Sequence, residues 1–311
     1  MYTRPQWFHV WYAAIVLAGG ARAAWLLNFP IGQAPSFAAP PLTPKAWPHP
    51  NRTTGCAGGT AVETRSRFVV ASLLSGGEHN DVYITYACKL GVSLRRFVDV
   101  DMLLLLPQGV NWTAAIPNET TLQSAGWRTC LVPALGTPEQ HYLYTKLAAW
   151  SLNYEAALML DLDTLVLGDI SPLFDLYPSL LRRHGALLAA VHDHPKHWSL
   201  RWNAAGDRFN AGVMLLLPDP ALHRWLVDGL ARIRYDDAML EQAYLNAALP
   251  YMPLPLEYNT MTLSAYAEPA TWARVLPDVR ILHYTVPKPH RSCSEYYMAH
   301  VCKVWTEAPM D

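Results

Sequence analysis

Two aspartates, Asp161 and Asp163, stand two residues apart directly after the apolar run at residues 156–160. Residues two apart on an extended chain point to the same side, so both carboxylates would face one point. Two like charges this close at the end of an apolar strand are costly unless a cation lies between them. A hard divalent ion such as Mn²⁺ or Mg²⁺, which also holds a diphosphate, would supply that cation. In the alternative interpretation, one aspartate caps a following helix or turn and the other is solvated.

Short apolar runs alternate with helical patterns from Arg67 onward, which is typical of a parallel sheet covered by helices. The predicted strands are residues 68–74, 98–106 and 156–160, and the predicted helices are residues 80–96, with Asn80 as N-cap, and residues 142–152. We therefore expect an α/β fold with an open, mostly parallel sheet flanked by helices. In such a sheet, ligands bind beyond the carboxyl ends of the strands, where the aspartates stand.

Charge and composition limit the classes of function. Lys and Arg number 24 against 25 Asp and Glu, so there is no electrostatic case for a nucleic-acid partner. Hydrophobic residues make up 51% of the chain and charged residues 16%, which indicates a globular protein with a large core rather than a disordered polymer.

The N-terminal residues have the layout of a secretory leader. The leader consists of a basic Arg4, an apolar stretch over residues 7–18 and small residues up to Ala23. It is either a signal peptide that is cleaved after Ala23 or an uncleaved anchor over residues 1–29. Residues 30–62 form a Pro-rich stem, and residues 63–311 form a single catalytic domain. We expect the secretory pathway: the Golgi lumen for an anchored type II membrane protein, or secretion if the signal is cleaved.

Two further features bear on this compartment. Three N-glycosylation acceptor patterns begin at Asn51, Asn111 and Asn118, and they matter only in a secreted or lumenal chain. The five cysteines lack CxxC spacing, which argues against a zinc site and leaves room for one or two disulfides. Cys293 with Cys302 is the preferred pair.

Several ordered motifs resemble those of one known enzyme family. The chain closely resembles the glycogenin-like retaining glycosyltransferases of family eight, which have a GT-A fold. The resemblance covers about residues 67–290, and its motifs are residues 80–83, 90–96, 144–152, 160–170, 173–175, 207–213, 241–246 and 254–259.

The resemblance implies a role for each matching position. It gives Asp161, Asp163 and His283 as ligands of Mn²⁺ or Mg²⁺, and Lys288 as the cation that neutralises the departing diphosphate. The implied contacts to the UDP-sugar are Asn80 and Tyr83 at the base and ribose, Lys146 and Leu162 near the donor, Asp207, Asn210 and Gly212 along the sugar, and Glu241 and Gln242 at its reacting face. Asp207, Glu241, Gln242 and Lys288 form the implied catalytic set, and no nucleophile is named.

This sequence also departs from the family pattern. Glu241 stands where most of the family has Asp, and residues 284–290 replace the usual glycine and Lys-Pro-Trp that follow His283. The self-glucosylated tyrosine of glycogenin has no secure equivalent, because Tyr266 lies near that position but not on it.

These features together predict a metal-dependent retaining glycosyltransferase. It would move a hexosyl or related sugar from a UDP-sugar to a glycan, glycolipid or glycoprotein acceptor. It would contact a membrane only through the N-terminal segment. The oligomeric state stays open, with a homodimer as one option. One alternative is a catalytically silent lumenal partner protein of the same fold. Another is a sugar nucleotidyltransferase, an enzyme class that usually has a Gly-rich, basic N-terminal loop; here the segment at residues 75–78 is short and lacks a basic partner.

Overall fold

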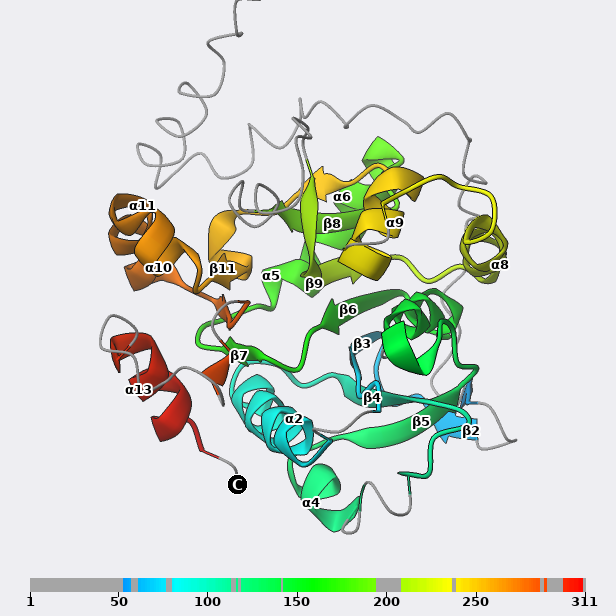
Figure 1. Cartoon of the computed structure of the whole chain (residues 1–311), viewed down its shortest axis with the longest axis horizontal. Coiled ribbons are helices and arrows are strands. Elements are labelled where there is room, and N and C mark those ends of the chain that lie inside the picture. The colour runs from blue at the N-terminus through cyan, green and yellow to red at the C-terminus, as the bar shows by residue number, and fades with distance from the viewer. Residues whose placement is uncertain are drawn as a thin grey trace, which may run out of the picture.

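A computed structural model gives the fold of this chain (Figure 1). It describes residues 53–56, 61–76, 80–112, 116, 119–140, 142–193, 208–236, 239–285, 288–289 and 299–309. The predicted leader over residues 1–29, most of the stem and Asp207 lie outside these ranges. Among the described residues, no helix has the length and apolar character needed to cross a bilayer.

A seven-stranded sheet lies at the centre, in the order β10-β8-β9-β6-β3-β4-β5. In chain order its strands are β3 (Phe68–Leu73), β4 (Asp101–Pro107), β5 (Arg128–Val132), β6 (Ala156–Leu160), β8 (Leu188–His192), β9 (Phe209–Leu216) and β10 (Met252–Pro253). β9 runs antiparallel to both of its neighbours, whereas the other pairs are parallel. The predicted α/β fold with a mostly parallel sheet is confirmed.

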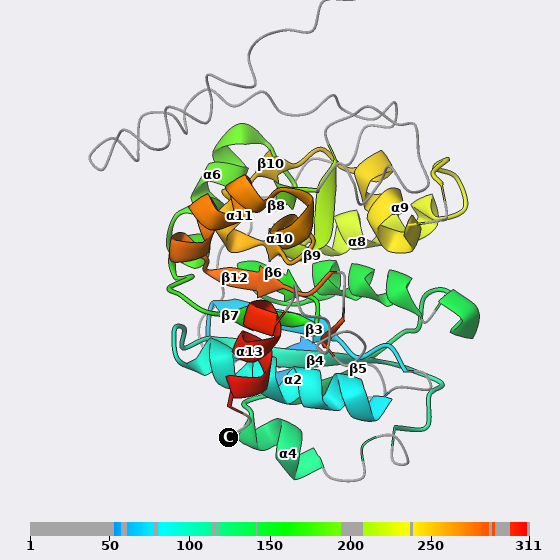
Figure 2. The ribbon, with the colours of Figure 1, turned by 60° about the vertical axis from the view of Figure 1, so that its left-hand side comes forward.

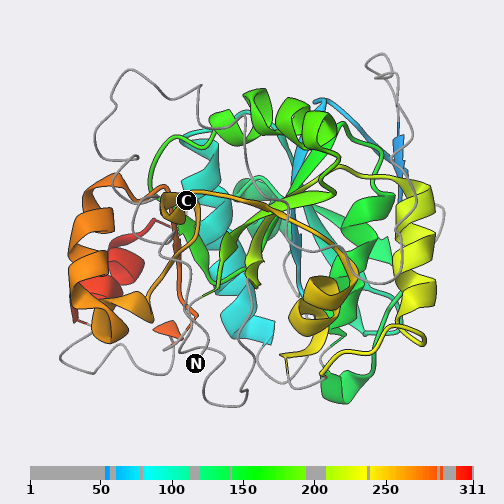
Figure 3. The same cartoon turned by 90° about the horizontal axis from the view of Figure 1, so that it is seen from above.

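Helices cover both faces of this sheet. They are α2 (Asn80–Arg95), α4 (Glu119–Ser124), η4 (Leu143–Ser151), α5 (Pro172–Asp175), α6 (Tyr177–His184), α8 (Pro220–Gly229), α9 (Leu240–Ala248), α10 (Ser264–Ala267), α11 (Pro269–Val275) and α13 (Ala299–Glu307), with short 3₁₀ turns η3 (Pro138–Gln140), η6 (Leu256–Tyr258) and η7 (Leu276–Asp278). Seen from above, α10 and α11 lie on one flank of the molecule and α8 lies on the opposite flank (Figure 3). The predicted helix over residues 142–152 is a 3₁₀ helix, and the predicted strand over residues 98–106 begins three residues later, at Asp101.

The alternation of side chains along the strands divides the core into two layers. Val70 and Leu104 pack with α2 in one cluster, whereas Val69 and Leu103 pack with η4, α8 and α9 in the other. Successive side chains of a strand point to opposite faces, and a sheet covered on both faces therefore needs apolar residues at every position. This explains why β4 and β6 read as continuous apolar runs.

A second, three-stranded sheet lies beside the first, in the order β11-β12-β7. Its strands are β7 (Thr164–Val166), β11 (Thr260–Met261) and β12 (Ile281–His283), and a separate hairpin pairs β1 (Thr53–Gly55) with β2 (Ala61–Glu63). β7 leaves β6 through the Asp161–Asp163 turn and pairs antiparallel with β12, so that His283 lies opposite Thr164.

The C-terminal helix α13 packs against α2 (Figure 2). The Lys89 ammonium of α2 is buried and donates to the carbonyls of Trp305, at 3.0 Å, and Ala308, at 2.5 Å. Burial lowers the pKa of Lys89, because the charged form loses contact with water. The lysine therefore caps the last turn of α13, whose carbonyls have no partners within the helix.

A disulfide joins Cys56 to Cys130, at the start of the described chain and in β5. The sequence did not predict this pair. Cys302 is also disulfide-bonded, and Cys293, its predicted partner, lies outside the described residues. Cys88 is a free, fully buried thiol, and burial raises its pKa.

The double variant Cys56→Ser/Cys130→Ser tests the contribution of this disulfide. Because the bond closes a loop with a sequence separation of 74 residues, we expect its removal to lower the free energy of unfolding by about 4 kcal/mol in the chain-entropy treatment. Urea unfolding followed by tryptophan fluorescence measures the change. Cys88→Ala, which removes a buried sulfur and no cross-link, is the control and should cost less. Equal losses in both variants would contradict the prediction.

Candidate active site

The two aspartates lie in the turn that links β6 to β7. The Asp161 backbone N–H donates to the Gly212 carbonyl at 2.8 Å, and the Thr164 hydroxyl donates to the Asp161 carbonyl at 2.7 Å. The Leu162 side chain between them is buried in the core, so only its backbone is available to a ligand. The turn therefore has both ends fixed, and its two carboxylates lie at the carboxyl edge of the sheet.

His283 reaches this turn through the second sheet. Its Nε2 lies 3.4 Å from Asp163 Oδ1 and 3.9 Å from Asp161 Oδ2, and one ligand atom from each residue lies within 4.8 Å of the others. The imidazole and Asp163 are buried, while Asp161 is partly exposed. Two carboxylates and an imidazole that converge from three directions suit a divalent cation, so these residues fit a metal site.

Lys288 contacts Asp163 Oδ2. Burial alone would raise the pKa of Asp163, but the Lys288 ammonium holds it well below its usual range. The pKa of Lys288 is raised, since the attraction of Asp163 outweighs its burial, and Asp161 and Tyr83 add to the rise. The altered sequence over residues 284–290 therefore still brings a protonated lysine to the carboxylate pair.

Lys146, Asp161 and Glu241 form a second ionic group. The Lys146 ammonium lies 2.7 Å from Asp161 Oδ1 and 2.6 Å from Glu241 Oε1, and Lys146 and Glu241 are both buried. Burial would lower the pKa of Lys146, but the two carboxylates raise it above its usual range. Burial raises the pKa of Glu241, and Lys146 offsets part of this rise. The longer side chain at Glu241 is thus held by a buried cation.

Strained backbone lies at the start of both helices that carry this pair. Tyr142, directly before η4, has φ 51°, and Leu240, the first residue of α9, has φ 46°. Left-handed backbone at non-glycine residues costs about 1–3 kcal/mol and tends to occur at functional sites. Among the described residues these are the positive-φ positions that are not glycine, and they stand next to the helices of Lys146 and Glu241.

Buried amide groups lie around the cluster of Asp161, Asp163 and His283. The Gln242 amide accepts from the Ala211 N–H at 2.8 Å and donates to Asp193 at 2.9 Å, and the Asn210 amide donates to the same carboxylate at 3.2 Å. Asp193 and Asn259 belong to this group, yet sequence reasoning gave neither a role. For Asp193 a signal existed, because it directly follows β8 at the carboxyl edge of the sheet.

Gly212 lies directly against the imidazole of His283. A Cβ placed on Gly212 would lie 2.1 Å from His283 Cε1, so the imidazole ring fills the space that a side chain would need. In this structure the close approach at Gly212 is made by His283, and the implied contact with the donor sugar stays a prediction. The remaining implied contacts, Asn80 and Tyr83, lie one turn apart at the start of α2, and Tyr83 is partly buried.

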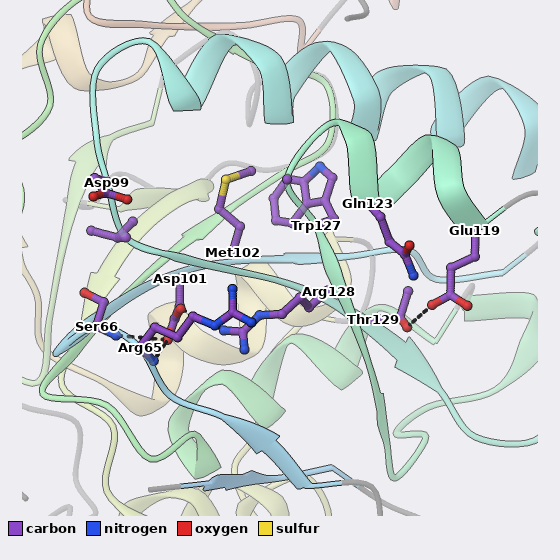
Figure 4. Close-up of a pocket in the computed structure, with 12 residues that line it drawn as sticks. Arg65, Ser66, Asp99, Asp101, Met102, Glu119, Gln123, Trp127, Arg128 and Thr129 are labelled. Atoms are coloured by element: carbon purple, nitrogen blue, oxygen red, sulfur yellow. Dashed lines mark hydrogen bonds and ion pairs between the residues drawn. The ribbon is translucent and has the colours of Figure 1, made fainter. Parts of the chain in front are cut away.

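A polar pocket of about 730 Å³ lies at the opposite edge, at the amino ends of β4 and β5 (Figure 4). Asp101 in this pocket accepts from the backbone N–H groups of Arg65 and Ser66 and from Tyr154, and it pairs with Arg128 at 2.8 Å. These internal contacts hold the sheet together, and this edge lies away from the converging aspartates.

Comparison with known proteins identifies the family. The sequence profile of Glycosyl transferase family 8 matches residues 130–292, just over half of the chain. This range contains Lys146, the aspartate pair, Glu241, Gln242, His283 and Lys288. No curated protein matches the sequence at a significant level.

Solved structures show the same fold. The galactosyltransferase LgtC, solved with donor and acceptor sugar analogs, is 19% identical, with a TM-score of 0.50 over 78% of this chain and 95% of LgtC. The bifunctional glycosyltransferase WbbM is 17% identical, with a TM-score of 0.55 over 80% of this chain and 50% of WbbM. GlyE from Streptococcus pneumoniae is 22% identical, with a TM-score of 0.50 over 78% of this chain and 61% of GlyE.

At these sequence identities, the structural matches establish the GT-A fold alone. The family profile match is more specific, because it includes the aspartate turn, Lys146 with Glu241, and His283. The chain therefore belongs to glycosyl transferase family 8, the retaining glycosyltransferases that use UDP-sugar donors.

Proposed function

We propose that this enzyme transfers a hexosyl or related sugar from a UDP-sugar to a glycan, glycolipid or glycoprotein in the secretory pathway, with Mn²⁺ or Mg²⁺ as its metal. The observation that carries the proposal is the convergence of Asp161, Asp163 and His283, whose ligand atoms lie within 4.8 Å of one another. When bound there, a divalent ion supplies positive charge that holds the diphosphate and stabilises it as it leaves.

The side chains around this cluster suit the transfer step. Lys288 stays protonated beside Asp163, so its ammonium can donate to phosphate oxygens as negative charge develops on the leaving group. Glu241 is held by Lys146 and Gln242 by the Ala211 N–H, so both groups are oriented before the substrate arrives. Since Glu241 is buried and paired, we give it an electrostatic role rather than that of a nucleophile.

Three features support the secretory location. The sequence of residues 1–62 has the layout of a leader and a stem, the Cys56–Cys130 disulfide is typical of oxidising compartments, and Asn111 of one glycosylation pattern is exposed. Each is independent of the active site.

A UDP-release assay on the full chain tests the proposal. The donors are UDP-glucose, UDP-galactose, UDP-glucuronate, UDP-xylose and UDP-N-acetylglucosamine, each with Mn²⁺ and with EDTA. We expect slow hydrolysis of one donor that is lost in EDTA. Absence of both turnover and Mn²⁺-dependent UDP binding in calorimetry would overturn the proposal and favour the catalytically silent partner.

The variant Asp163→Asn tests the metal assignment. It keeps the shape of the side chain and removes the charge that faces His283 and Lys288, so we expect turnover to fall roughly 100- to 1000-fold and Mn²⁺-dependent UDP binding to be lost. Circular dichroism should show an unchanged fold. Asp278→Asn, at an exposed position, is the matched control and should behave like the wild type. Full activity in Asp163→Asn would contradict the assignment.

The variant Lys146→Met tests the buried ionic group. It leaves the Glu241 carboxylate buried without its counter-charge, which costs about 3–5 kcal/mol of stability. Adding Glu241→Gln should recover part of this loss, because a neutral amide needs no counter-charge. Lys303→Met, which removes an exposed lysine paired with Glu307, is the control. Urea unfolding measures all variants, and wild-type stability in Lys146→Met would refute the prediction.

A further inference from the structure

Asn259 lies between η6 and β11 and is completely buried. Its Oδ1 is 2.9 Å from His283 Nδ1, and its Nδ2 is 3.0 Å from Asn210 Oδ1. The side-chain amide therefore bridges the metal-binding histidine and the first residues of β9. Neither the family resemblance nor the proposed function gives this residue a role.

Backbone groups fix the direction of these hydrogen bonds. The Gly212 N–H can only donate, and it donates to Asn210 Oδ1 at 3.0 Å, which identifies that atom as the acceptor. The other end of the Asn210 amide faces Asp193, whose carboxylate can only accept. The atom of Asn259 that faces Asn210 Oδ1 must therefore be the NH₂ group. Its carbonyl then faces His283.

A second backbone group anchors the same network. The Ala211 N–H donates to Gln242 Oε1, so the NH₂ of Gln242 faces the other oxygen of Asp193, at 2.9 Å. Asp193 thus receives one amide donor on each carboxylate oxygen, from Asn210 and Gln242. The chain of hydrogen bonds begins at two N–H groups of β9 and ends at the His283 ring, and all of its side chains are buried.

We propose that Asn259 is a positioning residue that holds the proton of neutral His283 on Nδ1, so that the lone pair of Nε2 points to Asp161 and Asp163. A neutral imidazole carries one ring proton, and the Asn259 carbonyl accepts it at Nδ1. The ring cannot shift toward β9, since it already fills the space above Gly212. Hydrogen bonds of this kind set the orientation and basicity of metal-binding histidines. This inference rests on the metal site of the proposed function.

Three variants of the full chain separate this role from plain packing. Asn259→Leu keeps the volume and removes the acceptor for the Nδ1 proton, whereas Asn259→Asp keeps an acceptor. The control is Asn246→Leu, which removes a partly buried amide that does not contact His283. The Asn246 amide bonds to the backbone N–H and carbonyl of Phe209 and to the Gln242 carbonyl.

Binding of Mn²⁺ in the presence of UDP is measured by electron paramagnetic resonance, and electron spin echo modulation detects a directly bound ring nitrogen. For Asn259→Leu we expect a 10- to 100-fold weaker affinity, as for other lost partners of metal-binding histidines, with a weakened nitrogen signal. Asn259→Asp should lie closer to the wild type, and Asn246→Leu should match it. A folded Asn259→Leu with wild-type affinity and nitrogen signal would overturn the proposal.

Nitrogen NMR of the metal-free, histidine-labelled protein reads the ring proton directly. Under conditions in which the ring signals show a neutral imidazole, the His283 signals, assigned by their loss in His283→Gln, should report a proton on Nδ1. A proton on Nε2 would overturn the inference regardless of metal binding. If the wild type shows the Nδ1 proton but binds no Mn²⁺ with UDP, the inference about the ring stands and the proposed metal fails.

Discussion

The antiparallel pairing of β7 with β12 is the constraint on which the site depends. β7 begins directly after the aspartate turn, and its register with β12 places His283 opposite Thr164. The backbone on the other side of β12 is held by β11, because the Thr262 N–H donates to the His283 carbonyl. A strand fixed on both edges cannot slide by one residue without turning its side chains over. The imidazole is therefore tied to the carboxylates by backbone hydrogen bonds rather than by its own contacts alone.

The reversed direction of β9 explains why amide groups gather at the same place. In a fully parallel sheet, the first residues of a strand lie at the edge opposite to the ligand. Because β9 runs antiparallel to β6 and β8, its beginning lies beside the end of β6, and Asp161 bonds to the carbonyl of Gly212. One reversed strand thus supplies both the backbone donors that orient the buried amides and the glycine on which the imidazole packs.

Local patterns were enough to predict part of this arrangement. The strand at residues 156–160, the aspartates behind it and the helix from Asn80 follow from periodicity and charge over a short stretch. Local patterns did not predict the 3₁₀ form of η4 or the start of β4 at Asp101. These features depend on packing and on long-range hydrogen bonds such as the one from the Arg65 N–H to Asp101. The GT-A fold was predicted from the order of several motifs along the chain, because no single motif is specific enough.

The parts that sequence could not supply are those made by distant segments. Asn259 gains its role only when the segment before β11 meets β9, and the Cys56–Cys130 pair joins positions with no shared pattern. Lys146 is another case: the resemblance places it near the donor, and only the structure shows that it lies buried between two carboxylates.

The cap that Lys89 places on α13 makes the C-terminal segment part of the packing of α2. The ammonium has left water, and its acceptors are the carbonyls of Trp305 and Ala308. A chain shortened before α13 would take these acceptors away from the Lys89 ammonium, on the same helix that carries Tyr83. Trimming this end of the protein therefore changes the surroundings of α2, although α13 and α2 lie far apart in sequence.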